Sequence, residues 1–167
     1  MASLEKMGAV LATKVLCGRD IVAEDVNITL PDITFTTVEV NGLGKINVPT
    51  CLTEPMQSTV SSVGMDKGFF NMLGLESKTF EYRFVKNLLE TSGDTGVRGY
   101  KAFLKGIPSN IPGGAVEPGS SWSGDVTFEV TRYQLYADGV EKILVDKLKG
   151  ICKINGKDYA KDINSLL

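Results

Sequence analysis

The clearest alternation of apolar and polar residues lies near the C-terminus, between Asp125 and Tyr136. Val126, Phe128 and Val130 alternate there with Asp125, Thr127, Glu129 and Thr131. A period of two predicts a strand with one buried face and one solvated face. Asp138-Gly139 predicts a tight hairpin turn, because both residues tolerate positive φ, and residues 140–148 form the return strand. Asn155-Gly156 predicts a second turn, before a polar tail that ends in Leu167.

Most of the remaining chain also predicts strands. The expected strands share β-branched residues, alternation or flanking turn residues, and they cover residues 13–17, 26–30, 33–40, 54–63, 79–85 and 97–107. In 54–63, Gln57, Thr59 and Ser61 lie on one face, and Met56, Ser58 and Val60 lie on the other. Neither face is strongly apolar, so we expect this strand to depend on its neighbours rather than on a core of its own.

One helix is expected between the strands. Asp66 is a plausible N-cap for residues 67–73, and Gly74 fits a left-handed stop. The shared face of Phe69, Met72 and Leu73 is suited to sealing one opening of a β-sandwich. A second, short helix is predicted over residues 3–11, where apolar residues recur at near-helical spacing.

Residues 106–124 contain three prolines and five glycines, which predicts a long arm rather than a helix or strand. Trp122, the only tryptophan, lies near the end of this arm. It either packs against its own domain or anchors the arm on a neighbouring subunit, and the sequence leaves both interpretations open. Many short strands without a βαβ rhythm predict an all-β sandwich or barrel with one short helix and a long flexible arm.

Length and composition favour a single domain spanning residues 1–167. A formal net charge of −2 gives no general attraction to nucleic acid or to an anionic membrane. No apolar run approaches the ~20 residues that a bilayer-spanning helix needs. Charges at Glu5, Lys6 and Lys14 argue against a signal peptide, so we expect the protein to be made in the cytoplasm and to stay there until assembled.

The residue types argue against catalysis. Histidine is absent, which removes the commonest general base and the commonest zinc ligand. Cys17, Cys51 and Cys152 are widely separated and predict three reduced thiols rather than a metal or redox site. Residues 42–45 only faintly resemble a phosphate loop, and Asn27-Ile28-Thr29 is a glycosylation pattern without a secretory signal. We expect no catalytic residues, no cofactor and no metal.

The order and spacing of several segments resemble the major tail tube protein of contractile-tailed bacteriophages, a family shared with phage-tail-like bacteriocins. The resemblance covers the chain from about Lys14 onward. Residues 1–13 depart from the family pattern and are interpreted as an N-terminal extension. It depends on the segment 26–31 with its later Gly-rich turn, the helix containing Phe69-Phe70, and the arm before Ser123. The most specific segments are 133–139, 140–146 and 153–158.

The resemblance implies a structural subunit of the virion tail. Such proteins form hexameric rings in which strands of neighbouring subunits join into one barrel around a lumen. Rings stack into a tube inside a contractile sheath, and the tube conducts DNA or punctures an envelope. The implied partners are other copies of the chain, the sheath, baseplate and tail terminator proteins, and the tape-measure protein and DNA in the lumen. Assembly is expected in the cytoplasm of the bacterial host.

Two sets of residues are candidates for these roles. Strands 32–40, 54–63, 97–107 and 123–136 are expected to line the lumen, and their polar candidates are Gln57, Thr59, Ser61, Asp125, Thr127, Glu129 and Thr131. A register error of one residue would reverse the face. The inter-subunit candidates in the arm are Ile107, Pro108, Ile111, Pro112 and Trp122. A conduit should not bind DNA, so Lys101 and Lys105 are expected to face a neighbouring subunit or to pair with acids such as Glu129.

Three alternatives remain at this stage. The tube protein of a type VI-like or other contractile injection system would share the fold and lack a DNA cargo. A monomeric ligand-binding β-sandwich would need a cluster of exposed aromatic residues, whereas the aromatic residues here are spread through expected core positions. A glycosidase would need two neighbouring carboxyl groups, which nothing in the sequence places together.

Overall fold

In a computed structural model, residues 5–6, 8–64 and 67–167 are described, and the fold there is mostly β. The strands and helices are β1 (Glu5–Lys6), β2 (Val10–Cys17), β3 (Asp20–Glu24), β4 (Asn27–Thr29), β5 (Phe35–Asn41), β6 (Lys45–Thr53), β7 (Met56–Gly64), α1 (Lys67–Asn71), β8 (Lys78–Glu90), β9 (Thr95–Pro108), β10 (Ser123–Ala137), β11 (Val140–Asp146), β12 (Ile151–Ile154), β13 (Lys157–Asp158) and α2 (Lys161–Ser165). The predicted all-β class is confirmed, although two short helices are present rather than one.

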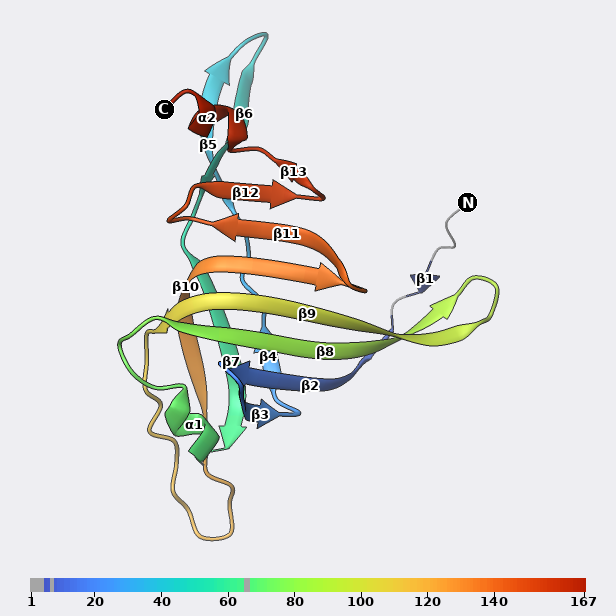
Figure 1. Ribbon diagram of the computed structural model, residues 1–167, viewed down its shortest axis with the longest axis vertical. Helices are drawn as coiled ribbons and strands as arrows, with labels where there is room; N and C mark the ends of the chain where they lie inside the picture. The colour runs from blue at the N-terminus through green and yellow to red at the C-terminus, as the bar shows by residue number, and fades with distance from the viewer. Residues whose placement is uncertain (1–4, 7, 65–66) are drawn as a thin grey trace.

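The main sheet is antiparallel and has its strands in the order β13-β12-β11-β10-β9-β8-β2-β3 (Figure 1). Strand β10 pairs with three others. Its residues 123–130 pair with β7, and residues 132–137 pair with β11. Residues 128–137 pair with β9, so β9 occupies one edge of β10, while β7 and β11 share the other edge. A register shift between Val130 and Arg132 marks the point where β10 exchanges β7 for β11.

The exchange of partners folds the sheet over itself. In Figure 1, β7 and the first half of β10 run along the long axis, whereas β2, β8 and β9 run across it. Two layers form an orthogonal sandwich when their strands cross at a large angle and one strand, bent at a bulge, belongs to both layers. Gly106 lies at this corner, where an added Cβ would come within 2.7 Å of the Glu129 carbonyl oxygen.

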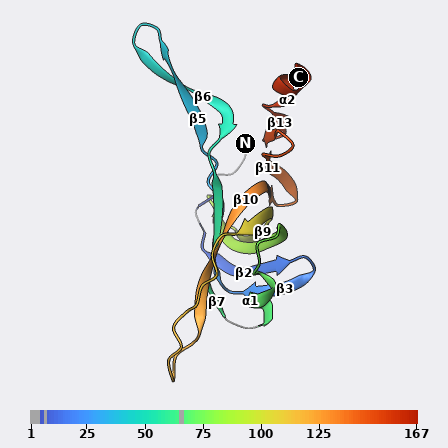
Figure 2. The same ribbon diagram turned by 90° about the vertical axis from the view of Figure 1, so that its left-hand side faces the viewer.

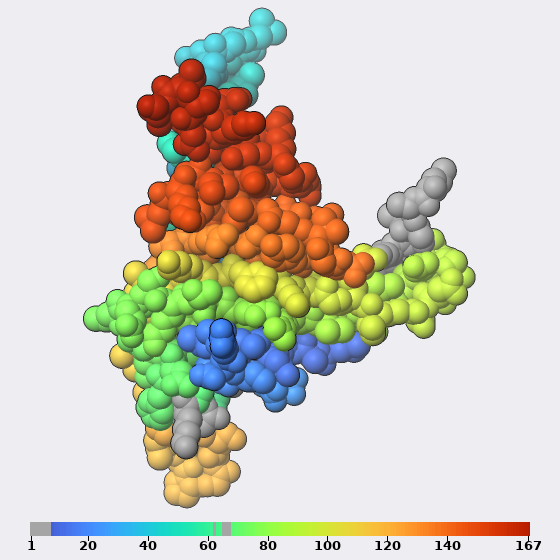
Figure 3. Space-filling model, in the orientation of Figure 1, coloured from blue at the N-terminus to red at the C-terminus, as the bar shows by residue number. Residues whose placement is uncertain are grey.

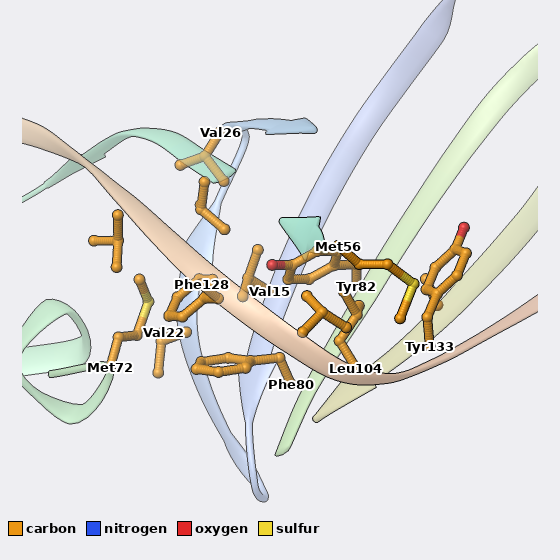
Figure 4. Packing of buried hydrophobic residues seen from close by; sticks show 14 of the residues in the cluster. Val15, Val22, Val26, Met56, Met72, Phe80, Tyr82, Leu104, Phe128 and Tyr133 are labelled. Atoms are coloured by element: carbon orange, nitrogen blue, oxygen red, sulfur yellow. The ribbon is translucent and has the colours of Figure 1, made fainter. Parts of the chain in front are cut away.

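The core lies between the two layers (Figure 4). Phe128 of β10 packs on Phe80 of β8, with ring centroids 4.2 Å apart. Strand β7 contributes Met56 and Val60, both fully buried. The less polar face of β7 thus lies in a core that it shares with the neighbouring strands, in agreement with the expectation that this strand depends on its neighbours.

Ser58 of β7 shows how a polar residue fits into this core. Its side chain is 0% exposed, and its hydroxyl donates to the Thr29 carbonyl at 2.9 Å. The Tyr82 hydroxyl lies 2.9 Å from the same Ser58 oxygen. Because Ser58 has one proton and gives it to Thr29, Tyr82 is the donor in the second bond. Burial raises the pKa of Tyr82 far above its ordinary value, against a smaller lowering by the Ser58 hydrogen bond.

Helix α1 closes one end of the sandwich, as predicted. Phe69 and Met72 are buried, and Leu73 packs partly against the core. The helix lies so close to β3 that a Cβ at Gly68 would meet the Val22 carbonyl oxygen at 2.5 Å. The helix ends at Asn71 rather than at residue 73, so Gly74, which has a positive φ of 131°, lies beyond its end and does not stop it directly. The predicted N-cap, Asp66, lies outside the described residues.

Two local predictions fail. The predicted helix over residues 3–11 is wrong where the chain is described, because residues 5–6 form β1 and Val10 begins β2. Helix α2 was not predicted, since residues 161–165 follow a polar turn and bury no side chain. By contrast, both predicted turns are confirmed, and Asp138 and Asn155 have a φ of 52°.

Strands β5 and β6 form a separate two-stranded sheet. This hairpin projects from one end of the molecule, beyond the C-terminal strands (Figures 1 and 2). The sequence placed residues 32–40 with 54–63 and 123–136 as lumen strands. In the described chain, however, β5 pairs with β6 and not with the sheet that contains β7 and β10.

Candidate functional site

The polar residues predicted on two distant strands meet on one sheet face. Strands β7 and β10 are antiparallel neighbours, with Thr59 opposite Thr127 and Gln57 opposite Glu129. The Gln57 side-chain amide donates to Glu129 Oε1 at 2.6 Å, and the two threonine hydroxyls lie 3.3 Å apart. The candidates on this face, which we call the polar face, are Gln57, Thr59, Ser61, Thr127 and Glu129, together with Asp125 in the register shift between Gly124 and Val126.

Thr131, the seventh candidate, lies beyond the region where β7 pairs with β10. It occupies the register shift between Val130 and Arg132. Its hydroxyl donates to the Lys105 carbonyl at 3.1 Å, so it already has an acceptor on β9. We therefore place Thr131 at the end of the polar face, where β10 turns away.

Strand β4 widens the polar face by one strand. Asn27 pairs with Ser61 and Thr29 pairs with Thr59, and both β4 residues are exposed. Ile28, between them, packs partly against the core. Asn27 and Thr29 were not among the residues predicted to line the lumen, although their alternation around Ile28 was a signal for an exposed polar face.

The charged groups near this face are few. Glu129 accepts a hydrogen bond from Gln57, and within the described residues no salt bridge joins Glu129 to Lys105. Lys101 likewise makes no salt bridge to any described residue. The expected pairing of these lysines with acids is therefore not found within one chain, and a position facing a neighbouring subunit remains a prediction.

The two edges of the polar face differ. Among the described strands, β4 pairs with β7 alone, so its outer edge has no strand neighbour. At the opposite edge, the Asn110 side chain covers β10. Its amide nitrogen donates to the Asp125 carbonyl at 3.0 Å, and its amide oxygen accepts from the Thr127 backbone N–H at 2.7 Å. The Asn110 side chain thus makes hydrogen bonds that a neighbouring strand would otherwise make to the backbone at this edge of β10.

The arm is shorter than predicted, because residues 106–108 belong to β9 and residues 123–124 to β10. Trp122 lies across its base, where the indole N–H donates to the Gly113 carbonyl at 2.8 Å. Trp122 is nevertheless 42% exposed, so it has both a partner in its own chain and a free surface. Pro108 is buried and Pro112 half-buried, whereas Ile107 and Ile111 are 37% and 67% exposed.

A further apolar surface, absent from the sequence analysis, lies on the β5–β6 hairpin. Val38 pairs with Val48 and Val40 pairs with Ile46, so these four side chains share one face, the apolar hairpin face. Their exposures are 55%, 44%, 47% and 58% in that order. The opposite face is polar and includes the exposed salt bridge between Lys45 and Glu39 at 3.5 Å. The signal was the alternation of apolar residues on either side of the turn at residues 42–44.

A cleft of about 600 Å³ lies on β8, β9 and β10 and includes Arg83, Lys101, Phe103 and Tyr136. Phe103 and Tyr136 meet edge to face, with ring centroids 5.7 Å apart. Asp138 is the one acid among the described residues that line this cleft. The cleft therefore lacks the pair of carboxyl groups that glycoside hydrolysis requires.

Two other kinds of site were sought in the described residues. No group of three or more Cys, Asp or Glu side chains is placed to hold a metal ion. Neither α1 nor α2, the helices of the described chain, is long and apolar enough to cross a membrane.

Comparison with known proteins then adds one match. A family model described as "Phage tail tube protein FII" matches residues 13–167. The matched region includes the polar face, the apolar hairpin face and the arm. It omits residues 1–12, which belong to the N-terminal extension and include the first residues of β2. A search of curated proteins found no match.

Proposed function

Because the chain belongs to the phage tail tube protein FII family, the structural tail tube subunits of contractile-tailed phages, we propose that it forms hexameric rings that stack into a hollow tube. Membership makes it a virion tail component and not an enzyme. The proposed tube lies inside the contractile sheath, ends at baseplate and terminator proteins, and holds the tape-measure protein and then DNA.

The observation that carries the proposal is the polar face on β4, β7 and β10. It combines hydroxyl, amide and carboxylate groups on a layer whose outer strand, β4, pairs on one edge alone among the described residues. We assign this face to the lumen. Each Lys or Arg that contacted a phosphate would release a counterion and add to the affinity for DNA. A wall of Gln57, Thr59, Ser61, Thr127 and their neighbours lets DNA pass without binding it.

Ring closure is proposed at the edges of this layer. The outer edge of β4 presents unpaired backbone groups, which favour pairing with another chain. A neighbouring subunit would bring its opposite edge, where Asn110 and Ser109 lie beside β10 and hydrogen-bond to it. Repetition of one heterologous contact gives a ring if the rotation closes, and closure of a barrel removes both edges.

Contacts between rings are proposed at the two ends of the long axis. The β5–β6 hairpin projects from one end and the arm from the other, as the space-filling view shows (Figure 3). Both carry exposed apolar side chains, on the apolar hairpin face and at Ile111 and Trp122. A patch at one end of a subunit can bind the patch at the other end of the next subunit. Repetition of such contacts produces an open filament. Ile107 and Pro112 remain candidates for contacts between subunits.

Electron microscopy of the purified chain in negative stain tests the proposal. We expect rings or tubes, either spontaneously or after addition of the baseplate that nucleates assembly in the phage. A matched preparation with the exposed β4 residues altered, by Asn27→Lys and Thr29→Lys, should contain folded subunits without closed rings, because lysine on an edge strand disfavours pairing with another chain. A wild-type chain that stays strictly monomeric at high concentration, even with the nucleator present, contradicts the proposal.

A further inference from the structure

Two cysteines that are distant in the sequence lie beside the same two clefts. Cys51 lies on β6 at the base of the hairpin, and Cys152 lies on β12. Both line a cleft with Ala160 and Ile163, and both line a second cleft with residues that include Tyr159. A pair of side chains that borders two clefts forms part of the wall between them.

Electrostatics agrees with this placement. Burial raises the pKa of the Cys152 thiol, and the negative charge of a Cys51 thiolate raises it further. The second effect requires that the two sulfur atoms lie within range of a direct Coulomb interaction. Cys152 is only 4% exposed, whereas Cys51 is half-buried. Cys17, on β2, lines neither cleft.

The hairpin that carries Cys51 is tied to the main sheet at few points. Within the described chain, β5 and β6 pair only with each other. At their base, the Lys147 ammonium donates to the carbonyls of Thr53 and Glu54, and Phe35 packs partly against the core. A covalent bond between β6 and β12 would therefore restrict the position of the whole hairpin.

We propose that Cys51 and Cys152 form a redox latch, a disulfide that fastens the β5–β6 hairpin to β12 when the protein meets a disulfide oxidant. The more accessible Cys51 thiolate attacks one sulfur of oxidised glutathione and releases one glutathione thiolate. The Cys152 thiolate then attacks the Cys51 sulfur and releases the second. The two protein thiols lose two protons and two electrons, and the oxidant becomes two glutathione thiols. This inference does not depend on tube assembly.

The test treats the full-length protein with oxidised glutathione and maps the linked peptides by mass spectrometry without reduction. We expect a Cys51–Cys152 peptide in the wild type and in Cys17→Ser, and its loss in Cys51→Ser and Cys152→Ala. The bond closes a loop of about 100 residues, so oxidation should raise the melting temperature by about 10 °C in the wild type and in Cys17→Ser, but not in Cys51→Ser or Cys152→Ala. Hydrogen exchange of the β5–β6 amides should slow in the same sample.

Other outcomes overturn the proposal. Glutathione adducts without a Cys51–Cys152 link would mean that the two sulfurs cannot meet. Links that involve Cys17 or a second chain would place the reactive pair elsewhere. A link that forms without slowing exchange in the hairpin would leave the two cysteines joined but disprove the latch. Cys51→Ser keeps the buried Cys152 intact, so it decides the result even if Cys152→Ala fails to fold.

Discussion

Replacing all four residues of the apolar hairpin face by threonine should weaken contacts between subunits without unfolding the chain. The variant is Val38→Thr, Val40→Thr, Ile46→Thr and Val48→Thr. These side chains are 44–58% exposed in the single chain, so their loss removes little from its own core. Threonine is β-branched like valine and suits a strand, so the hairpin should persist.

The size of the effect follows from the area that assembly would bury. Full burial of a Val or Ile side chain stabilises by about 1.5–3 kcal/mol, and about half of each side chain remains available here. The remaining burial is worth about 1 kcal/mol per residue. Threonine loses most of this, because a methyl group is replaced by a hydroxyl that must be desolvated. Four positions give about 4 kcal/mol per hairpin, which corresponds to about a thousandfold weaker association at each contact.

Sedimentation velocity over a concentration series, with negative-stain images of the same samples, measures this change. The matched control places threonine on the opposite face of the same hairpin, at the cross-strand pair Glu39 and Asn47. The control should assemble like the wild type, and far-UV circular dichroism should be the same for all three proteins. If the fourfold variant assembles at the wild-type concentration, the apolar hairpin face is not a contact and the argument from its exposure is refuted.

Three other predictions concern the arm, the lumen and the core. Replacing residues 111–120 by two glycines keeps the Asn110 bonds to β10 and should spare folding while abolishing tubes in electron micrographs; normal tubes would show that the arm is dispensable. Asp125→Lys with Glu129→Lys should leave tubes intact but slow DNA ejection from reconstituted particles, because each lysine adds a phosphate contact, and the matched amides Asp125→Asn with Glu129→Gln should eject normally. In urea denaturation, Tyr82→Phe should cost about 1 kcal/mol, because Ser58 keeps its Thr29 acceptor, whereas Ser58→Ala should cost about 1–3 kcal/mol by leaving a buried Tyr82 hydroxyl unpaired. Equal costs for the two core variants would mean that the proposed donor direction is wrong.

The polar face illustrates which part of the candidate site was accessible from sequence. Gln57, Thr59 and Ser61 were correctly separated from Met56 and Val60, because alternation within one strand is a local property. That Gln57 would bond to Glu129 was not predictable, since the two residues are 72 positions apart. Only the pairing of β7 with β10 brings them together, and no local pattern specifies that pairing.

The apolar hairpin face shows the opposite kind of failure. The alternation around residues 42–44 was visible, but a strand with one apolar face normally buries that face. The sequence analysis therefore assigned residues 32–40 to the body of the sheet. Exposure depends on whether another layer covers the face, and in this chain β5 and β6 project beyond every other described strand.

By itself, the sequence determined the local features of this protein: the faces of β7 and β10, the turns at Asp138 and Asn155, the short helix before Gly74, and the family. Each depends on side chains within a few positions of one another, or on their order along the chain. Only the tertiary structure decided that β10 exchanges β7 for β11 at Thr131, that Asn110 covers one edge, and that Cys51 lies beside the clefts of Cys152. These are contacts between distant segments, and their energies depend on how the layers pack, which the spacing of residues along the chain does not encode.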